Sequence, residues 1–265
     1  MQITLIRHGM YDKSTGHITR DGIEEGIGAG LVLGNATDPK LPDFLDNEPG
    51  FGYRIPVAQD PLEKPDLILM SPSIRAKETG FAFLEQLKRF DIEPEVKNNV
   101  SYLNDLDLFT DGYKPDHHGC ITNEMAESLY SAEPIQKTVD LIQRMAKEGK
   151  EHIVIISHQP NIDVLLKLLG NDSLYNLSGG RYYAPEYGVA YTLLDVNPEK
   201  IGQEKYQLQI RNTKPTIRNA YFVSLDIAGL SVLPIDYVEW YMPDFARLDK
   251  ENRIKNARSG GKERE

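Results

Sequence analysis

The sequence predicts an α/β fold built on a largely parallel sheet with helices on both faces. Two observations predict it: candidate strands and helices alternate along the chain, and the clearest strands are apolar throughout. Continuously apolar strands are buried on both faces, which is typical of parallel sheets covered by helices. The 265 residues are enough to bury one substantial core.

Each element is predicted from its pattern of apolar residues. The strand candidates are residues 2–6, 67–70, 96–103, 153–156, 188–196 and 206–210. The helix candidates are residues 18–33, 71–90, 124–147 and 161–169. Within residues 18–33 a turn at Asp21-Gly22 is expected before the helix, and Gly26, Gly28 and Gly30 weaken the helical pattern. Ser71 as N-cap with Pro72 in the first helical position is expected to start the second helix.

The chain is expected to form one main domain over residues 1–219, with a surface insertion. The insertion covers residues 34–64, where Pro and Gly are frequent and apolar periodicity is lost. Residues 220–246 are expected to form a C-terminal extension packed on the domain. The charged segment 247–265 has few apolar residues and is expected to be disordered.

Charge and cysteine content exclude several classes of function. The net charge is −10, whereas nucleic-acid-binding proteins carry a basic excess or a basic face, so no nucleic acid partner is expected. The single cysteine, Cys120, allows no internal disulfide and is expected to be a small buried side chain in a reducing compartment. There is no signal-peptide pattern and no apolar segment of membrane-spanning length, so we expect a cytoplasmic protein without a membrane partner.

Three candidate strands end in residues suited to binding a phosphate. Arg7-His8-Gly9 follows the first strand, Ser71 to Arg75 follow the second, and Ser157-His158 follow residues 153–156. The carboxyl ends of neighbouring parallel strands meet at one edge of a sheet, so two His and two Arg side chains would converge there. Each residue could alone be an ordinary surface or core residue, but their joint appearance favours a phosphate site.

Five segments carry motifs in a fixed order along residues 1–210. They are L-I-R-H-G at 5–9, I-T-R-D-G-I-E-E-G at 18–26, S-P-S-I-R-A-K-E-T at 71–79, A-E-S at 126–128 and I-I-S-H-Q-P-N-I at 155–162. This set resembles the motifs of the histidine phosphatase superfamily, in the branch that includes the cofactor-dependent phosphoglycerate mutases. Ala126 stands where the family usually has glycine.

The resemblance implies a three-layer α/β/α sandwich and catalysis through a phosphohistidine. Carried over by motif, His8 is the nucleophile, and Arg7, Arg75 and His158 bind the phosphoryl oxygens, with His158 also counted among the catalytic residues. The general acid is expected at Asp105, because Y-L-N-D at residues 102–105 resembles the mutase segment in which a glutamate follows Leu-Asn. The next candidates for the acid are Asp107 and then Asp111.

The chemistry of these residues agrees with phosphoryl transfer. Guanidiniums bind phosphoryl oxygens with a fixed fork geometry, and their charge keeps a neighbouring imidazole neutral. Positive charge from Arg and His side chains can replace a metal ion, so a metal-independent enzyme without a cofactor is expected. The pair His117-His118 has no partner at a ligand spacing, and no metal site is expected there.

Some positions depart from the mutase pattern. Tyr11 and Ser14 stand where mutases usually carry Ser or Thr and then Asn, and the segment after Asp105 lacks their Arg, His and Tyr. These differences favour hydrolysis over transfer between hydroxyls. Gln159 replaces the Asp typical of the acid-phosphatase branch and disfavours a phytase-like enzyme. Two alternatives remain open: a phosphoglycerate mutase-like phosphomutase, and a catalytically silent phosphate-binding or interaction module.

The expected partner is a small phosphorylated substrate or a phosphoprotein. A sugar phosphate, a nucleotide, a phosphoprotein and a phosphohistidine protein all suit the same core pocket. Selectivity is expected to depend on three segments, residues 34–64, 107–120 and 182–187. The last of these is interpreted as a packed loop in preference to a stacking platform.

Overall fold

The computed structural model describes residues 1–37, 62–104, 123–170 and 185–211. These residues belong to one of two compact units of the chain, the unit of Met1–Asp43 and Ile55–Lys214. Its strands are β1 Gln2–Arg7, β2 Leu67–Met70, β3 Glu95–Lys97, β4 His152–Ser157, β5 Ala190–Leu193 and β6 Leu208–Arg211. Its helices are α1 Arg20–Thr37, α3 Ile74–Lys88, α4 Asn123–Tyr130, α5 Glu133–Lys147 and α6 Gln159–Leu169, with 3-10 helices η1 Ser101–Leu103 and η2 Pro198–Lys200.

The described strands form one sheet in the order β3-β2-β4-β1-β5-β6. β4 lies at its centre and pairs in parallel with β1 and β2, and β2 pairs in parallel with β3. β5 is antiparallel to both β1 and β6, so it alone among the described strands runs in the opposite direction. The predicted α/β fold with a mostly parallel sheet is confirmed.

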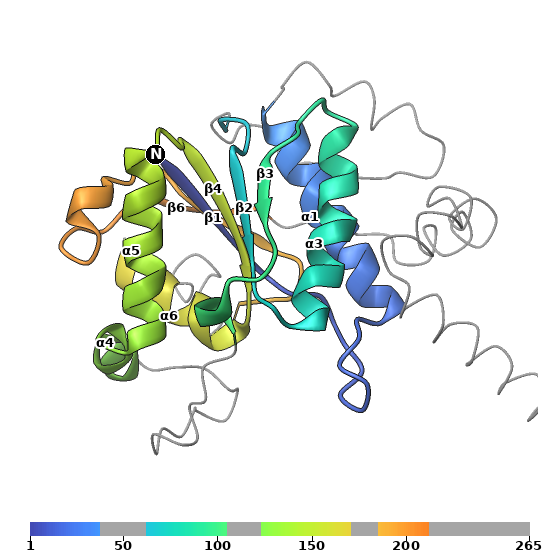
Figure 1. Ribbon diagram of the computed structural model, residues 1–265, viewed down its shortest axis with the longest axis horizontal. Helices are drawn as coiled ribbons and strands as arrows, with labels where there is room; N and C mark the ends of the chain where they lie inside the picture. Colours follow the sequence, from blue (N-terminus) through green and yellow to red (C-terminus); the bar gives the residue numbers. More distant parts are fainter. Residues whose placement is uncertain (38–61, 105–122, 171–184, 212–265) are drawn as a thin grey trace, which may run out of the picture. The chain divides into compact units, whose positions relative to one another are not determined.

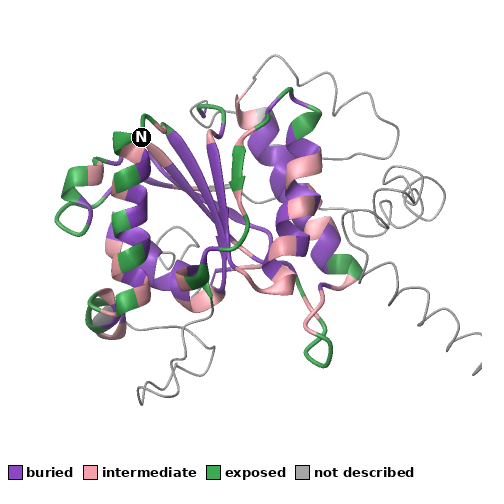
Figure 2. Ribbon diagram, viewed as in Figure 1, coloured by how far each residue is buried: buried purple, intermediate pink, exposed green. Residues whose placement is uncertain are grey.

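Helices cover both faces of this sheet. Figure 1 shows α4, α5 and α6 on one side and α1 and α3 on the other. Alternate strand residues such as Leu5, Leu69 and Ile155 join the helices of the first side in one hydrophobic cluster. On the second side, Gly80 of α3 lies directly against the side chain of Met70. β2 and β4 are therefore buried from end to end (Figure 2), and the three-layer α/β/α sandwich is confirmed.

Gly26 and Gly30 of α1 form a surface that packs against α3. A Cβ on Gly26 would lie 2.9 Å from the backbone oxygen of Thr79, and one on Gly30 would lie 2.5 Å from that of Phe83. Their spacing of four residues puts both on the face that contacts α3. The expected turn at Asp21-Gly22 is wrong, because these residues lie inside the helix. The glycines allow the two backbones to approach, and this contact offsets their low helix propensity.

Other boundaries also differ from the sequence prediction. α3 begins at Ile74, and its N-cap is Ser73, whose side chain accepts from the backbone N–H of Ala76. Ser71 lies before the helix, so the expected capping by Ser71 is wrong. The helix expected over 124–147 is two helices, which break before Pro134. The strand expected over 96–103 is the short β3 followed by η1.

α1 continues to Thr37, so its last residues occupy the start of the expected insertion. The backbone N–H of Leu62 donates to the carbonyl of Ala36 at 2.9 Å, and this bond joins the two described ends of that segment. Residues 38–61, the C-terminal extension 220–246 and the charged segment 247–265 lie outside the described residues. Among the described helices, none has the length and hydrophobicity needed to cross a membrane.

Candidate active site

The strand order brings the three phosphate-binding segments to one edge of the sheet. β4 lies between β2 and β1, with Met70 paired to Ile156 and Arg7 paired to Ser157. The ladder continues one step beyond the strands, where the N–H of His8 donates to the carbonyl of Ser157 at 2.9 Å. Because all three strands run in the same direction, the residues that follow them start from adjacent positions.

His8 is buried, and its hydrogen bonds fix its tautomer. Its Nδ1 lies 2.8 Å from the backbone oxygen of Gly9, which can only accept, so Nδ1 carries the proton. The Nε of Arg75 donates to Nε2 of His8 at 3.2 Å. Nε2 therefore carries the lone pair and faces a guanidinium.

His158 lies beside His8, with 5.0 Å between the ring centroids. Its Nδ1 accepts from Nη2 of Arg75 at 3.0 Å, so the proton is on Nε2, which donates to Oγ of Ser71 at 2.9 Å. Oγ of Ser73 lies 3.2 Å from the same nitrogen. The Ser71 side chain thus orients His158.

Burial and positive charge keep both imidazoles neutral. Burial, assisted by the charges of Arg75 and Arg7, lowers the pKa of His8 to about 3, against the opposing effect of the hydrogen bond to Gly9. Burial, followed by the influence of His8 and the two arginines, lowers the pKa of His158 to about 2. At neutral pH, Nε2 of His8 is therefore unprotonated, and its electron pair accepts from Nε of Arg75.

Arg7 is held by the segment before β5. Its Nη1 donates to the backbone oxygen of Pro185 at 2.9 Å, and its Cζ lies 3.6 Å from the ring centroid of Tyr187. Its Nε is buried and has no hydrogen-bond partner among the described residues. Burial lowers the pKa of Arg7, while Tyr187 and Glu25 act in the opposite direction.

The loop after β1 contributes residues that the sequence analysis did not assign to the site. Tyr11 lies edge-on to His8, with 5.2 Å between ring centroids, and its ring lies 4.7 Å from Cζ of Arg75. Oγ1 of Thr79 accepts from the N–H of Gly9 at 2.8 Å and so holds the start of this loop against α3. The departure from the mutase pattern at Tyr11 is the available signal in the sequence, and by itself it indicates only a preference for hydrolysis over transfer.

The same loop is tied to α3 further along. Nδ1 of His17 lies 2.5 Å from Oε1 of Glu78, and Oε2 of that carboxylate accepts from the N–H of Ile18 at 2.8 Å. Glu78 is buried within the second arginine motif, three residues after Arg75. These bonds connect the loop that carries Tyr11 to the helix that carries Arg75.

The three candidate general acids, Asp105, Asp107 and Asp111, lie outside the described residues. The chain leading to them is described as far as Asn104. Oγ of Ser157 donates to the carbonyl of Leu103 at 2.7 Å, and Nδ2 of Asn161 donates to the carbonyl of Asn104 at 3.1 Å. Ser157 and Asn161 lie on either side of His158 in the sequence, so the end of η1 contacts the segment that carries His158.

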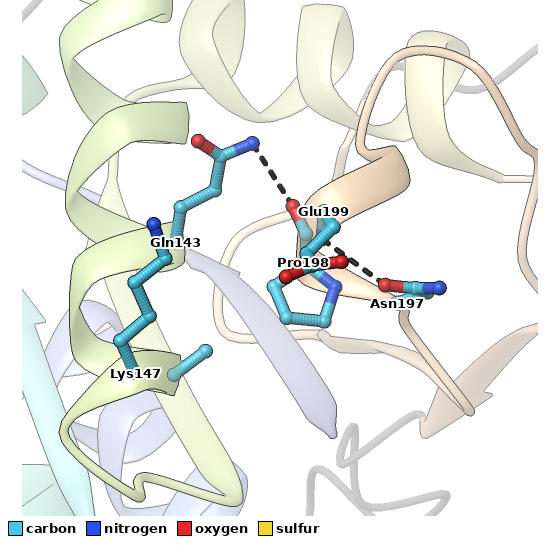
Figure 3. A pocket seen from close by; sticks show the side chains of 6 residues that line it. Gln143, Lys147, Asn197, Pro198 and Glu199 are labelled. Atoms are coloured by element: carbon cyan, nitrogen blue, oxygen red, sulfur yellow. Dashed lines mark hydrogen bonds between the residues drawn. The ribbon is translucent and has the colours of Figure 1, made fainter.

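No group of His, Cys, Asp and Glu side chains suited to a metal ion occurs in the described part of the chain. His117 and His118 lie outside it, so the prediction about that pair stays a prediction. A hollow of about 460 Å³ between α5 and η2 lies elsewhere (Figure 3). It is lined by Gln143, Ala146, Lys147, Asn197, Pro198 and Glu199. Leu193, at the end of β5 that leads to η2, pairs with Ile3, so this hollow lies toward the opposite edge of the sheet.

The described arrangement places guanidiniums beside a neutral imidazole. Arg75 contacts both His8 and His158, and Arg7 flanks His8, so positive charge surrounds one neutral imidazole nitrogen. Guanidiniums suit the oxygens of a tetrahedral oxyanion. The geometry defines the class of site as one that can bind a phosphoryl group next to a nucleophilic histidine.

No family model matches the chain, and no curated protein matches it. Among solved structures, the chain is similar to the protein histidine phosphatase SixA complexed with tungstate, at 14% identity over 80% of this chain and 97% of that chain, with a TM-score of 0.43. It is similar to mycobacterial glucosyl-3-phosphoglycerate phosphatase at 16% identity over 80% and 98%, with a TM-score of 0.44. It is also similar to phosphoglycerate mutase from Bacillus anthracis at 13% identity over 73% and 87%, with a TM-score of 0.42.

Proposed function

We propose that this chain is a phosphatase that hydrolyses a phosphomonoester or a phosphohistidine through a covalent intermediate on His8. The observation that carries the proposal is the position of Arg75, which donates to Nε2 of His8 and to Nδ1 of His158. A phosphoryl group that replaced these two contacts would accept the same donors through its oxygens. It would then lie in front of the free electron pair of His8.

In the first step, binding of a phosphate dianion compensates for the positive charge that keeps the imidazoles neutral. His158 can then take up a proton at Nδ1 and donate to a phosphoryl oxygen, while Ser71 holds its other nitrogen. The buried Nε of Arg7 supplies a further donor. Catalysis of this kind depends on positioning and neutralisation of charge, which these side chains provide without a metal ion.

In the second step, Nε2 of His8 forms a bond to phosphorus as the bond to the leaving oxygen breaks. The leaving oxygen takes a proton from the general acid, for which Asp105 remains our candidate. Water then attacks the phosphohistidine, the same carboxylate accepts its proton, and inorganic phosphate and neutral His8 are released. Asp105 is supported by sequence position: the carbonyl of Asn104, the residue before it, is held by Asn161 of α6, three residues after His158.

The proposed partner is a small phosphorylated substrate or a phosphoprotein, without a metal or cofactor. Tyr11, which lies against His8 where mutases usually carry Ser or Thr, favours hydrolysis over phosphomutase activity. A mutase would depend on a bisphosphorylated activator, and a silent module would bind phosphate without turnover. The following experiment separates these three functions.

The test is hydrolysis of 4-nitrophenyl phosphate by the purified full chain in the presence of EDTA. We expect turnover in the wild type and a loss of about 10³-fold or more in His8→Ala, because the nucleophile is removed. When the wild type is mixed with an aryl phosphate that is radiolabelled in its phosphoryl group and the reaction is then quenched, a labelled, acid-labile phosphoenzyme should be trapped. His8→Ala should not form it. His152→Gln, which alters a buried histidine at the opposite end of the sheet, is the control and should retain turnover.

Each alternative has its own outcome. Phosphate release only after addition of a bisphosphorylated activator would support the mutase. Binding of inorganic phosphate with no turnover of any phosphoester would support the silent module. Equal turnover by the wild type and His8→Ala would refute a mechanism through His8.

A further inference from the structure

Each guanidinium of the site lies against the face of a tyrosine ring. Cζ of Arg7 is 3.6 Å from the ring centroid of Tyr187, and Cζ of Arg75 is 4.7 Å from that of Tyr11. Both rings also contact the nucleophile candidate, at centroid distances of 5.7 Å for Tyr187 and 5.2 Å for Tyr11 from His8. The two arginines and the central imidazole are thus flanked by an aromatic pair, Tyr11 and Tyr187.

The backbone fixes where each ring of the aromatic pair stands. Tyr187 forms a bridge with Arg7, and the next N–H, that of Gly188, donates to the carbonyl of Arg7 at 3.2 Å. Gly188 has φ of +64° and packs against Glu25, so a side chain there would be strained and would clash. Tyr11 forms a β-bridge with Ile18 across its loop, and the backbone N–H of Ile18 donates to the carboxylate of Glu78 in α3. Both rings are therefore attached to the framework that carries the arginines.

An aromatic face offers an arginine something that a carboxylate does not. A cation over a ring is held by the quadrupole of the ring, which carries no net charge. A carboxylate partner would hold the guanidinium as well, but it would occupy the N–H groups and cancel the charge that an oxyanion needs. None of the ion pairs between described residues involves Arg7, although Glu25 favours its charged form through space.

We propose that Tyr11 and Tyr187 are positioning residues that hold Arg75 and Arg7 by their faces, in the orientation in which these guanidiniums bind an oxyanion. The inference rests on the proposed function, because it assigns these arginines to the same anion. The rings act through the arginines and not through their hydroxyl groups. Substitution of either tyrosine by phenylalanine should therefore leave anion binding unchanged, whereas substitution by an aliphatic residue should weaken it.

The test measures the affinity of the full chain for tungstate by calorimetry, and the kcat and KM for 4-nitrophenyl phosphate. Tyr11→Phe and Tyr187→Phe should bind tungstate as the wild type does. Tyr11→Leu and Tyr187→Leu should each weaken tungstate binding about tenfold, within the range of a desolvated cation–π contact. Turnover should fall in the leucine variants and recover in the phenylalanine variants.

Tyr130→Leu is the matched control, because Tyr130 is also half-buried but donates to the carbonyl of Ile201, far from the site. It should leave tungstate affinity unchanged. If a leucine variant does not fold, the methionine variant at the same position is measured in its place. Tungstate affinity in the aliphatic variants equal to that of the wild type would overturn the inference, as would an equal loss in the phenylalanine variants, which would assign the effect to the hydroxyls. If the wild type binds tungstate but hydrolyses nothing, the proposed phosphatase activity fails while the affinity comparison still decides the role of the rings.

Discussion

The two histidines of the site differ from ordinary histidines because each has one nitrogen committed to a fixed partner. His8 donates to the carbonyl of Gly9, and His158 donates to Ser71, so in both rings the second nitrogen carries a lone pair directed at Arg75. A protonated ring would place positive charge against the guanidinium in a buried site. The folded protein therefore keeps both rings neutral at acidic pH values at which the same rings are protonated in the unfolded chain.

This difference predicts a pH dependence of stability. The histidine pKa is 6.5 in the reference state and about 3 for His8 and about 2 for His158 in the folded protein. Between pH 6.5 and 3 the unfolded chain binds more protons than the folded chain, so the free energy of unfolding falls as the pH falls. Each histidine contributes up to about 1.4 kcal/mol per pH unit to that slope.

Urea unfolding of the wild type, His8→Asn and His158→Asn at pH 7 and at pH 4.5 measures this effect. Each variant lacks one titrating group, so its loss of stability between the two pH values should be smaller than that of the wild type. The comparison uses the pH difference within each protein, and a general destabilisation by either substitution cancels. If both variants lose as much stability between pH 7 and pH 4.5 as the wild type does, the buried imidazoles are not the source of the pH dependence.

At the scale of single elements, two hydrogen bonds join the end of η1 to the end of β4 and to the first turn of α6, beside His158. Asn161 in the first turn of α6 donates to the carbonyl of Asn104, and Ser157 at the end of β4 donates to that of Leu103. The side-chain oxygen of Asn161 is buried without a hydrogen-bond partner among the described residues. A buried polar atom without a partner costs free energy, and the bond that the same amide makes to Asn104 opposes this cost.

We predict that Asn161→Leu lowers kcat for 4-nitrophenyl phosphate about tenfold, because a displacement of the residue after Asn104 misplaces the proposed acid. KM and tungstate affinity should change little, since the arginines are untouched. Gln143→Leu is the control, because it removes a similar bond from a side-chain amide to the backbone oxygen of Pro198 at 2.9 Å, away from the site. A parallel loss of tungstate affinity in Asn161→Leu would contradict a role limited to the acid.

Element boundaries show how far local sequence rules extend. The low helix propensity of glycine argues against a helix at α1. However, Gly26 and Gly30 face the backbone of α3, and helix propensity does not include that contact. Ser71-Pro72 has the composition of a helix start, yet Ser71 binds His158 and the cap is Ser73. In both cases a partner distant in sequence decides the local structure, and single-segment patterns carry no information about that partner.

For the whole molecule, the segment between Thr37 and Leu62 is attached to the sandwich at both of its described ends. The N–H of Leu62 bonds to the carbonyl of Ala36, and Leu62 itself is buried. We predict that replacing residues 38–61 by a short Gly-Ser linker leaves turnover of 4-nitrophenyl phosphate nearly intact and changes the order of preference among larger phosphoesters. The measurement is kcat/KM across a panel of phosphorylated sugars, nucleotides and phosphopeptides. Equal losses on every substrate, including the aryl phosphate, would contradict a role in selectivity.

The sequence by itself determined the fold class and four of the residues that meet at the site. Continuous apolar strands such as residues 153–156 predict burial on both faces, and that inference needs no knowledge of distant contacts. Arg7, His8, Arg75 and His158 stand directly after such strands or in the first turn of the helix that follows, so the parallel direction of the strands alone indicates that they can converge.

Only the tertiary structure decided how these side chains are held. The order β2-β4-β1 made the three strand ends neighbours, and the tautomers of His8 and His158 follow from contacts with Gly9, Ser71 and Arg75. Tyr11 and Tyr187 are separated by most of the described chain and meet only across His8. The physical reason is that burial patterns are local and periodic, whereas hydrogen bonds, ring contacts and the pKa of a buried imidazole depend on partners that the fold brings from distant parts of the chain.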